Sequence, residues 1–265
     1  MKKLAVVITH PIQYYSPLFR LINESHEIEL KVFYTWSQTR EEVYDPKFGR
    51  VLKWDIPLLD GYEYEFITNI STNPNSQTLD GIINPNLIPK LEEWNPTSIL
   101  VIGWNHRSHL KAMKYFKGKV PVYFRGDSTL LDDMPLWKTV LRYLWLRRVY
   151  RKVDFALYVG ENNKRYFRRY GLSNEQLKYA PHVIENQRFY ETDDLSYTKA
   201  AEKRRHELGL SESDIVFLYV GKFEPKKNPK LLIQAAAKLP QFKFLFVGSG
   251  DLENELKDMA SSLCN

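Results

Sequence analysis

One stretch near the end of the chain, residues 214–228, combines a strand pattern with a cluster of cations. Its sequence is DIVFLYVGKFEPKKN. The run from Asp214 to Val220 is short, apolar, β-branched and aromatic, which predicts a buried strand. A helix is expected to begin at about Pro229. Between them lie three lysines: Lys222, Lys226 and Lys227. Cations between a strand's carboxyl end and a helix amino terminus suit a phosphate or diphosphate, although lysines can also simply solvate a loop.

The order of strand, loop and helix recurs along the rest of the chain. Continuous apolar runs predict strands at 4–9, 29–34, 98–102, 120–124, 155–159 and 242–247. Helices are expected at 18–23, 88–94, 110–115, 136–152, 163–170, 196–208 and 251–263. Residues 36–80 are harder to read, with one short strand expected within 58–67. This alternation predicts a doubly wound α/β fold with a parallel sheet covered on both faces.

The composition indicates a folded protein without disulfides. Of the 265 residues, 43% are hydrophobic, and Cys264 is the single cysteine. One cysteine excludes an internal disulfide and a cysteine zinc site, and it fits a reducing compartment. The opening MKKLAVVITHP has too short an apolar core for a signal peptide, and no run reaches the ~18 apolar residues of a membrane span. We therefore expect a cytoplasmic protein.

The net charge and the absence of certain motifs limit the classes of partner and enzyme that we expect. A net charge of +6 favours anionic partners such as nucleotide-sugars, lipid phosphates or acidic membranes. No recognised nucleic-acid-binding motif accompanies this charge, so nucleic acid is not an expected partner. The Gly-x-Gly-x-x-Gly fingerprint is absent after every predicted strand, which argues against a nicotinamide-dependent oxidoreductase.

Polar side chains follow three of the predicted strands, at the edge where open α/β sheets bind ligands. They are His10, Gln13 and Tyr14 after the first strand, His106 and His109 after 98–102, and Arg125 and Asp127 after 120–124. His10 and Tyr14 could instead pack their loop, and Arg125 could pair with Asp127. His106 and His109 have metal-ligand spacing on a helix. No cysteine or carboxylate cluster accompanies them, so we expect no metal site.

The predicted helix 136–152 has the unusual sequence LWKTVLRYLWLRRVYRK. Its two tryptophans and six basic residues allow it to lie on an anionic membrane surface. Its cations are spread around the axis, so a core helix whose long cations reach out to solvent is an equally good interpretation. A peripheral contact with the inner membrane face therefore remains an expectation to test.

The stretch VGKFEPKKNPKLLIQA resembles the donor-binding motif of GT4-type (group 1) glycosyltransferases of the GT-B fold. The resemblance implies that Lys222 and Lys227 hold the diphosphate of a nucleotide-sugar. Arginine is usual at position 222, and lysine keeps the charge but loses the planar two-point fork. The turn GSGDL at 248–252 resembles the family's Gly-x-Gly-Pro-Leu turn, with Asp251 in place of proline. There Gly248 and Gly250 would permit close approach near the nucleotide.

The first half of the chain resembles one branch of the same family. The similar stretches are HPIQY with PLF, GWNHRSH followed by VPVYFRGDS, and KYAPHVIEN at the crossing to the second domain. The resemblance implies catalytic candidates at His10, His106 and Arg125. It places Gln13, Tyr14, Asp127, His182 and Glu185 on the acceptor side of the cleft. Many relatives have a functional histidine where this chain has Arg125 and Asp127, so His106 or His109 is the candidate substitute.

The resemblance predicts two Rossmann-like doubly wound domains, the second incomplete. Residues 1–185 would be the acceptor-side domain, and residues 186–265 the linker and first half of the nucleotide-sugar-binding domain. A domain normally needs ~100 residues to bury its own core, and fewer follow the linker. The family's Glu-x7-Glu motif, which contacts sugar and ribose, would fall beyond Asn265. We therefore expect weak or no transfer by these 265 residues alone.

The implied function is a metal-independent, retaining hexosyltransferase acting in polysaccharide biosynthesis. Its donor would be a nucleotide-sugar, UDP- or GDP-linked, which is a substrate, so no cofactor is expected. Its acceptor would be a glycan or lipid-linked saccharide. The alternative is a non-catalytic fragment of the same fold that binds an acceptor or a partner.

Overall fold

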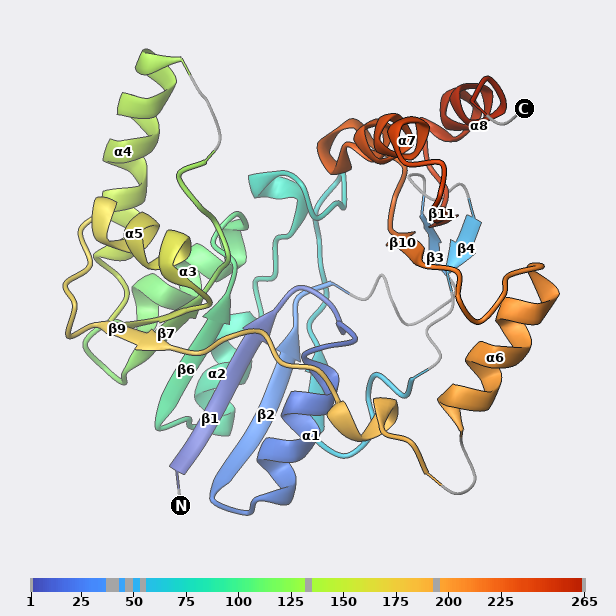
Figure 1. Ribbon diagram of the computed structural model, residues 1–265. Coiled ribbons are helices and arrows are strands. Elements are labelled where there is room, and N and C mark those ends of the chain that lie inside the picture. Colours follow the sequence, from blue (N-terminus) through green and yellow to red (C-terminus); the bar gives the residue numbers. More distant parts are fainter. Residues whose placement is uncertain are drawn as a thin grey trace. The chain divides into compact units, whose positions relative to one another are not determined.

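A computed structural model of the chain describes residues 2–36, 43–45, 50–52, 56–131, 135–192 and 196–263. The chain divides into two compact units (Figure 1). One unit comprises residues 1–41 and 54–185, and the other comprises 42–53 and 186–265. A short antiparallel hairpin, β3 (Val43–Asp45) with β4 (Arg50–Leu52), lies in the segment assigned to the second unit.

The first unit is built on a seven-stranded parallel sheet. Its strands are β1 (Lys2–Ile8), β2 (Ile28–Tyr34), β5 (Glu63–Phe66), β6 (Ser98–Ile102), β7 (Val122–Arg125), β8 (Phe155–Tyr158) and β9 (Leu177–Tyr179). The order is β5-β2-β1-β6-β7-β8-β9. The chain thus builds one half outward from β1, then returns to the middle and builds the other half from β6. The crevice between β1 and β6 is where this topology places a ligand.

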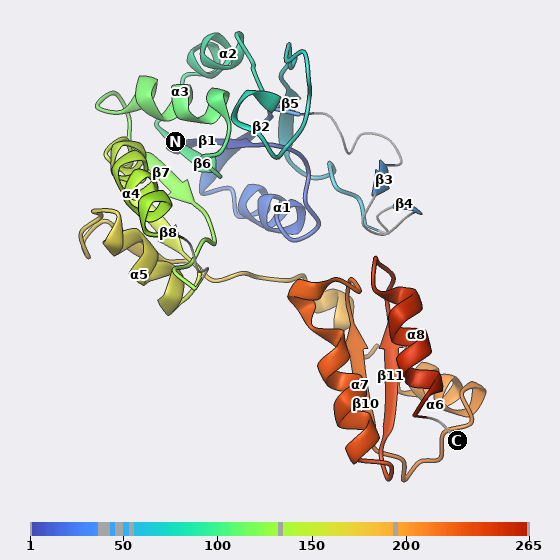
Figure 2. The ribbon, with the colours of Figure 1, turned by 90° about the horizontal axis from the view of Figure 1, so that it is seen from above.

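Helices cover both faces of this sheet. They are α1 (Ser16–Glu24), α2 (Leu87–Trp94), α3 (Arg107–Phe116), α4 (Leu136–Tyr150) and α5 (Glu161–Arg169), with a short 3-10 turn η1 (Leu79–Gly81). Successive residues of β1 alternate between the faces. Ala5 and Val7 join the core formed with α2, α3, α4 and α5, whereas Val6 and Ile8 pack with Phe19 of α1. Figure 2 shows α1 and α2 on opposite sides of β1 and β2.

The second unit pairs two parallel strands, β10 (Val216–Val220) and β11 (Lys243–Val247). Its helices are α6 (Tyr197–Glu207), α7 (Pro229–Lys238) and α8 (Glu253–Ser261), with 3-10 turns η2 (Asn186–Phe189) and η3 (Pro225–Lys227). The small core contains Phe223, Ile233 and Leu256, packed with Tyr219 and Phe246 of the two strands. Figure 2 shows these strands beside α7 and α8.

The predicted α/β class and the doubly wound arrangement are confirmed, and most predicted strands lie within two residues of the observed ones. Helix α3 begins at Arg107, three residues earlier than predicted, so His109 lies on the helix and His106 immediately before it. The prediction of a buried strand at 214–220 was wrong in its burial. Leu218 and Val220 of β10 are exposed, because α7 and α8 pack on the other face of the two-stranded sheet, where Tyr219 and Phe246 lie.

Candidate functional site

A pocket lined by both polar and apolar side chains opens at the carboxyl ends of β1, β6, β7 and β8, where the strand order changes direction. Its volume is about 300 Å³. Six predicted site residues line it: His10, Tyr14, His106, Arg125, Asp127 and His182. Because parallel strands end at one edge of the sheet, residues far apart in the sequence meet there. Two other predicted residues do not line it: Gln13 is exposed, and Glu185 forms an ion pair with Arg20 at 3.8 Å.

His106 is the buried imidazole of this pocket. Its side chain is only 2% exposed, and its Nδ1 atom has no hydrogen-bond partner among the described residues. Burial lowers the pKa of His106, while a hydrogen bond with the Thr78 backbone partly opposes that shift. A buried nitrogen without a partner is uncommon in folded proteins. The His106 ring is therefore part of the pocket wall, and its buried Nδ1 is left without a partner among the described residues.

His109 is the structural neighbour of His106, and the two rings meet edge to face with their centroids 5.2 Å apart. His109 is fully buried between the carbonyl of Gly103, 2.9 Å from Nδ1, and the hydroxyl of Thr35, 3.0 Å from Nε2. The carbonyl can only accept, so Nδ1 carries the proton. Burial and the nearby His106 lower the pKa of His109 to about 3. His109 therefore holds strand ends together and offers no ring atom to a ligand.

His10 and Tyr14 lie on the loop after β1. The Nδ1 atom of His10 is 2.9 Å from the Thr9 hydroxyl, and burial, followed by the charge of His106, lowers the pKa of His10. Tyr14 is 40% exposed and meets the ring of His182 edge to face at 5.8 Å. Desolvation raises the pKa of Tyr14, and the nearby Tyr15 and Asp127 add to that rise. The pocket thus has neutral imidazoles inside and a neutral phenol at its rim near pH 7.

Arg125 ends β7, and its guanidinium contacts the protein itself. Its Nε donates to the Tyr15 hydroxyl at 2.9 Å, Nη1 to the carbonyl of Ala180 at 2.6 Å and Nη2 to that of Pro181 at 3.1 Å. No ion pair joins Arg125 to Asp127 within the described chain, so the pairing considered from the sequence was wrong. Three of its five N–H donors are used on fixed partners. These contacts make Arg125 an anchor for the segment that leaves β9.

A loop that sequence reasoning did not assign to the site closes one side of the pocket. Ser76 lines the pocket, and its carbonyl accepts a hydrogen bond from Asn105 at 3.3 Å. Short polar side chains hold the loop in place. Asn75 Oδ1 accepts from the backbone of Gln77 and Thr78, at 2.9 and 2.8 Å. Such bonds from asparagine to nearby backbone are the signal that the sequence TNPNSQ offered.

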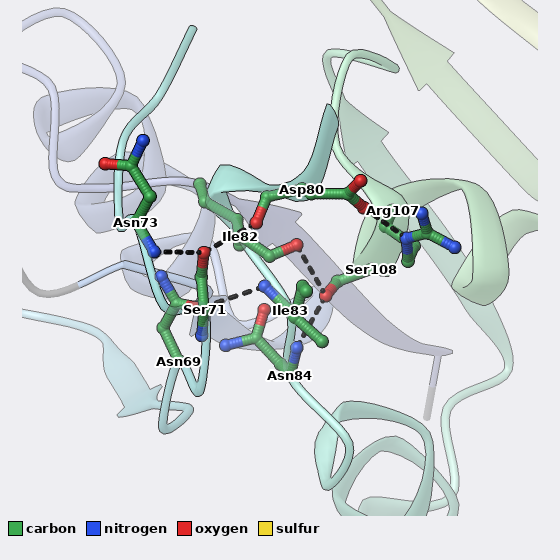
Figure 3. A network of polar contacts seen from close by, with 9 residues as sticks. All are labelled: Asn69, Ser71, Asn73, Asp80, Ile82, Ile83, Asn84, Arg107 and Ser108. Carbon is green, nitrogen blue, oxygen red and sulfur yellow. Dashed lines mark hydrogen bonds and ion pairs between the residues drawn. The ribbon is translucent and has the colours of Figure 1, made fainter. Parts of the chain in front are cut away.

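Figure 3 shows how this loop is fastened to α3. Ser108 donates to the carbonyl of Ile82 and accepts from the backbone of Asn84 at 2.7 Å, and Arg107 pairs with Asp80. The Asn84 side chain donates toward the carbonyls of Thr35, Ile67 and Thr68, each at 3.0 Å. The loop that carries Ser76 and Thr78 is thereby fixed to the helix that follows His106.

In the second unit, the predicted diphosphate loop follows β10 as expected. Lys222 is half-buried and Lys227 is exposed, and α7 begins at Pro229 directly after them. Asn228 adopts the left-handed conformation, with φ 48°, which turns the chain from η3 into α7. This arrangement is that of a strand, a basic loop and a helix amino terminus, which together favour an anion.

Gly248 and Gly250 let two loops of the second unit approach each other closely. An added Cβ at Gly248 would lie 1.9 Å from the carbonyl oxygen of Gly221, and one at Gly250 would lie 2.6 Å from that of Phe223. The Phe223 amide donates to the carbonyl of Ser249 at 2.9 Å, which joins the same two loops. The absence of side chains at Gly248 and Gly250 therefore leaves room for the backbone of Gly221 and Phe223. A further approach by a nucleotide at this point stays a prediction.

No group of three or more His, Cys, Asp or Glu side chains able to hold a metal ion is present in the described part of the chain. Both ring nitrogens of His109, which has metal-ligand spacing from His106 in the sequence, face protein atoms. Metal independence stays a prediction about the reaction.

Comparison with known proteins adds a family match over part of the chain and a fold. The model of the family "Glycosyl transferases group 1" matches residues 200–265, the segment that contains the Lys222 loop and the Gly248 turn. No curated protein sequence matches the chain.

Several solved structures have the same fold over nearly the whole chain. Alr3699/HepE of Anabaena, in complex with UDP, is 17% identical with a TM-score of 0.64, over 99% of this chain and 66% of that one. A glycosyltransferase of Rickettsia africae is 11% identical with a TM-score of 0.62, over 99% and 65%. The UDP-GlcNAc 2-epimerase of Neisseria meningitidis, bound to UDP-GlcNAc, is 17% identical with a TM-score of 0.53, over 100% and 71%.

The chain spans about two thirds of the length of these proteins. At these identities the likeness establishes the fold, and the family match is confined to the second unit. The chain therefore has the GT-B-like fold of these solved proteins, and its residues 200–265 match the glycosyl transferases group 1 family.

Proposed function

We propose that this protein is a GT4-type glycosyltransferase that moves a sugar, with retention of configuration, from a UDP- or GDP-sugar to an acceptor hydroxyl. The acceptor class would be a glycan or a lipid-linked saccharide. The observation that carries the proposal is the basic loop after β10, which precedes α7 and lies inside the segment that matches the family. The UDP complex of the Anabaena protein, which has the same fold, supports a nucleotide-sugar as donor.

The second unit would bind the donor. Lys222 and Lys227 would neutralise the diphosphate as negative charge develops on it in the transition state. The amino terminus of α7 would add backbone N–H groups and the positive end of its dipole.

The pocket of the first unit would bind the acceptor. His106 and Asp127 line it with an imidazole and a carboxylate, and Tyr14 and His182 form an aromatic rim. Neutral imidazoles and a carboxylate can orient sugar hydroxyls through directed hydrogen bonds. His10 and His106 would position the reacting hydroxyl.

The reaction would form a bond between the acceptor oxygen and the anomeric carbon, while the bond from that carbon to the diphosphate oxygen breaks. The acceptor's proton would pass to the leaving diphosphate. No protein base is then needed, so the protein contributes orientation and charge stabilisation. In this scheme no metal or cofactor takes part.

NMR observation of UDP-glucose, UDP-N-acetylglucosamine and their GDP counterparts, with a panel of saccharide acceptors, tests the proposal. We expect acceptor-dependent release of the nucleoside diphosphate and a product with the donor's anomeric configuration. Turnover should be slow, below about 1 per second, the low end of enzyme rates. The Lys222→Ala/Lys227→Ala variant should reduce it at least tenfold.

Two results would contradict transfer. Interconversion of the sugar at C2 without an acceptor would assign the chain to the chemistry of the epimerases that share its fold. Binding of nucleotide without any consumption of nucleotide-sugar would leave the non-catalytic alternative, in which the chain binds an acceptor or a partner.

A further inference from the structure

Helix α4 has apolar residues on two faces. Leu146, Val149 and Tyr150 point into the core. Its outer face carries six further large apolar side chains, which recur at helical spacing and are 42–80% exposed: Leu136, Trp137, Val140, Leu141, Leu144 and Trp145. The outer face of a helix on a globular protein is normally polar. Six large apolar side chains in one exposed stripe mark an interaction surface.

The charges around this stripe are all of one sign along the helix. From Pro135 to Val153 the sequence has six basic residues and no Asp or Glu, although Asp132 and Asp133 precede it. Four cations of this segment are exposed: Lys138, Arg147 and Arg148 on the helix and Arg151 directly after it. Helix α5 adds Arg169, whose guanidinium lies 5.1 Å from the Tyr143 ring of α4. The first two acids that follow the helix in sequence form ion pairs, Asp154 with Lys117 and Glu161 with Arg165.

We propose that the outer face of α4 binds the surface of an anionic phospholipid bilayer. The apolar stripe would enter the boundary between headgroups and acyl chains, to a depth of about 5–10 Å, and the cations would contact lipid phosphates. Tryptophan suits this boundary, since its ring is apolar and its N–H is polar. No helix in the described part of the chain is long and apolar enough to cross a bilayer, so α4 would lie flat. This inference is independent of the proposed transferase activity.

The charge pattern favours a lipid surface over a protein partner. A second copy of this chain would bring the same cations against each other, which is unfavourable. An anionic bilayer accommodates both the apolar stripe and the cations around it. Each contact between a cation of the protein and a lipid phosphate adds about 1 kcal/mol to binding, and the apolar side chains are removed from water.

Co-sedimentation with vesicles tests the proposal. Vesicles of phosphatidylcholine alone and of equal parts phosphatidylcholine and phosphatidylglycerol would be mixed with the 265-residue chain at 0.1 M salt. We expect binding to the anionic vesicles, reduced at least tenfold by Leu141→Glu/Leu144→Glu. The matched control is Leu21→Glu/Leu231→Glu, which adds the same charge at apolar positions that are 64% and 60% exposed elsewhere. It should bind within twofold of wild type.

Fluorescence locates the contact. Brominated lipids should quench the wild type on binding, and Trp137→Phe/Trp145→Phe should keep the binding but lose most of that quenching, although four other tryptophans remain. Equal loss of binding in the α4 and control variants, or binding without quenching, would overturn the proposal. So would a wild-type dimer in light scattering that becomes a monomer in Leu141→Glu/Leu144→Glu, since the stripe would then join two copies.

Discussion

Replacing Arg125 by methionine is expected to destabilise the first unit by about 3 kcal/mol. The guanidinium donates three hydrogen bonds, to Tyr15, Ala180 and Pro181, from a side chain that is 5% exposed. Methionine fills similar space but leaves three acceptors without a donor, at about 1–3 kcal/mol for each group that stays buried. Relaxation of the exposed segment at 180–181 returns part of that cost. Urea-induced unfolding, followed by circular dichroism, measures the difference in the free energy of unfolding.

The matched control is Arg165→Met. Arg165 is an exposed arginine whose partner is Glu161 at 3.4 Å, and such surface pairs contribute less than about 1 kcal/mol. An Arg125→Met protein as stable as wild type, but unable to bind an acceptor, would show that Arg125 contacts ligand and is not an anchor.

Replacing His109 by asparagine is expected to make the protein less sensitive to acid. In the folded state burial lowers the pKa of His109 to about 3, whereas in the unfolded chain it is near 6.5. Between these values the unfolded state binds the proton and the folded state does not, so stability falls as the pH falls below about 6.5. At pH 4.5 this costs the wild type about 2–3 kcal/mol relative to pH 7.5.

Asparagine keeps a donor for the Gly103 carbonyl but cannot take up a proton. The His109→Asn protein will be less stable at pH 7.5, because its contact with Thr35 is lost. Between pH 7.5 and pH 4.5 its free energy of unfolding should fall by about 2 kcal/mol less than that of the wild type. The control is His26→Asn, at an exposed turn residue with φ 54°. Its free energy of unfolding should fall between pH 7.5 and pH 4.5 by as much as that of the wild type. Parallel curves for wild type and His109→Asn would contradict the account.

Much of the architecture followed from the sequence because each strand of a covered parallel sheet has a continuous apolar pattern. The same topology explains why His10, His106 and Asp127, though distant in sequence, were predicted for one site. Strands of a parallel sheet end at a common edge, so the residues that follow them converge.

The remainder depends on contacts that no local pattern encodes. The role of Arg125 is set by carbonyls 55 and 56 residues away. The loop at 69–84 is held by asparagine and serine bonds, which have no periodicity. The exposure of β10 and of the α4 stripe depends on which elements pack against them. An apolar run predicts a strand or a helix, but it does not predict which other element will cover it.

Calorimetric titration of the 265-residue chain with UDP and GDP tests the central claim, that the loop after β10 holds a nucleoside diphosphate. We expect saturable binding that Lys227→Ala weakens at least tenfold, since a charged hydrogen bond to phosphate is worth about 1.5–3 kcal/mol. Lys226→Ala, its exposed neighbour in the same turn, should bind within threefold of wild type. A folded chain that binds neither nucleotide, or in which both variants bind like wild type, would contradict the assignment of this loop as the donor site.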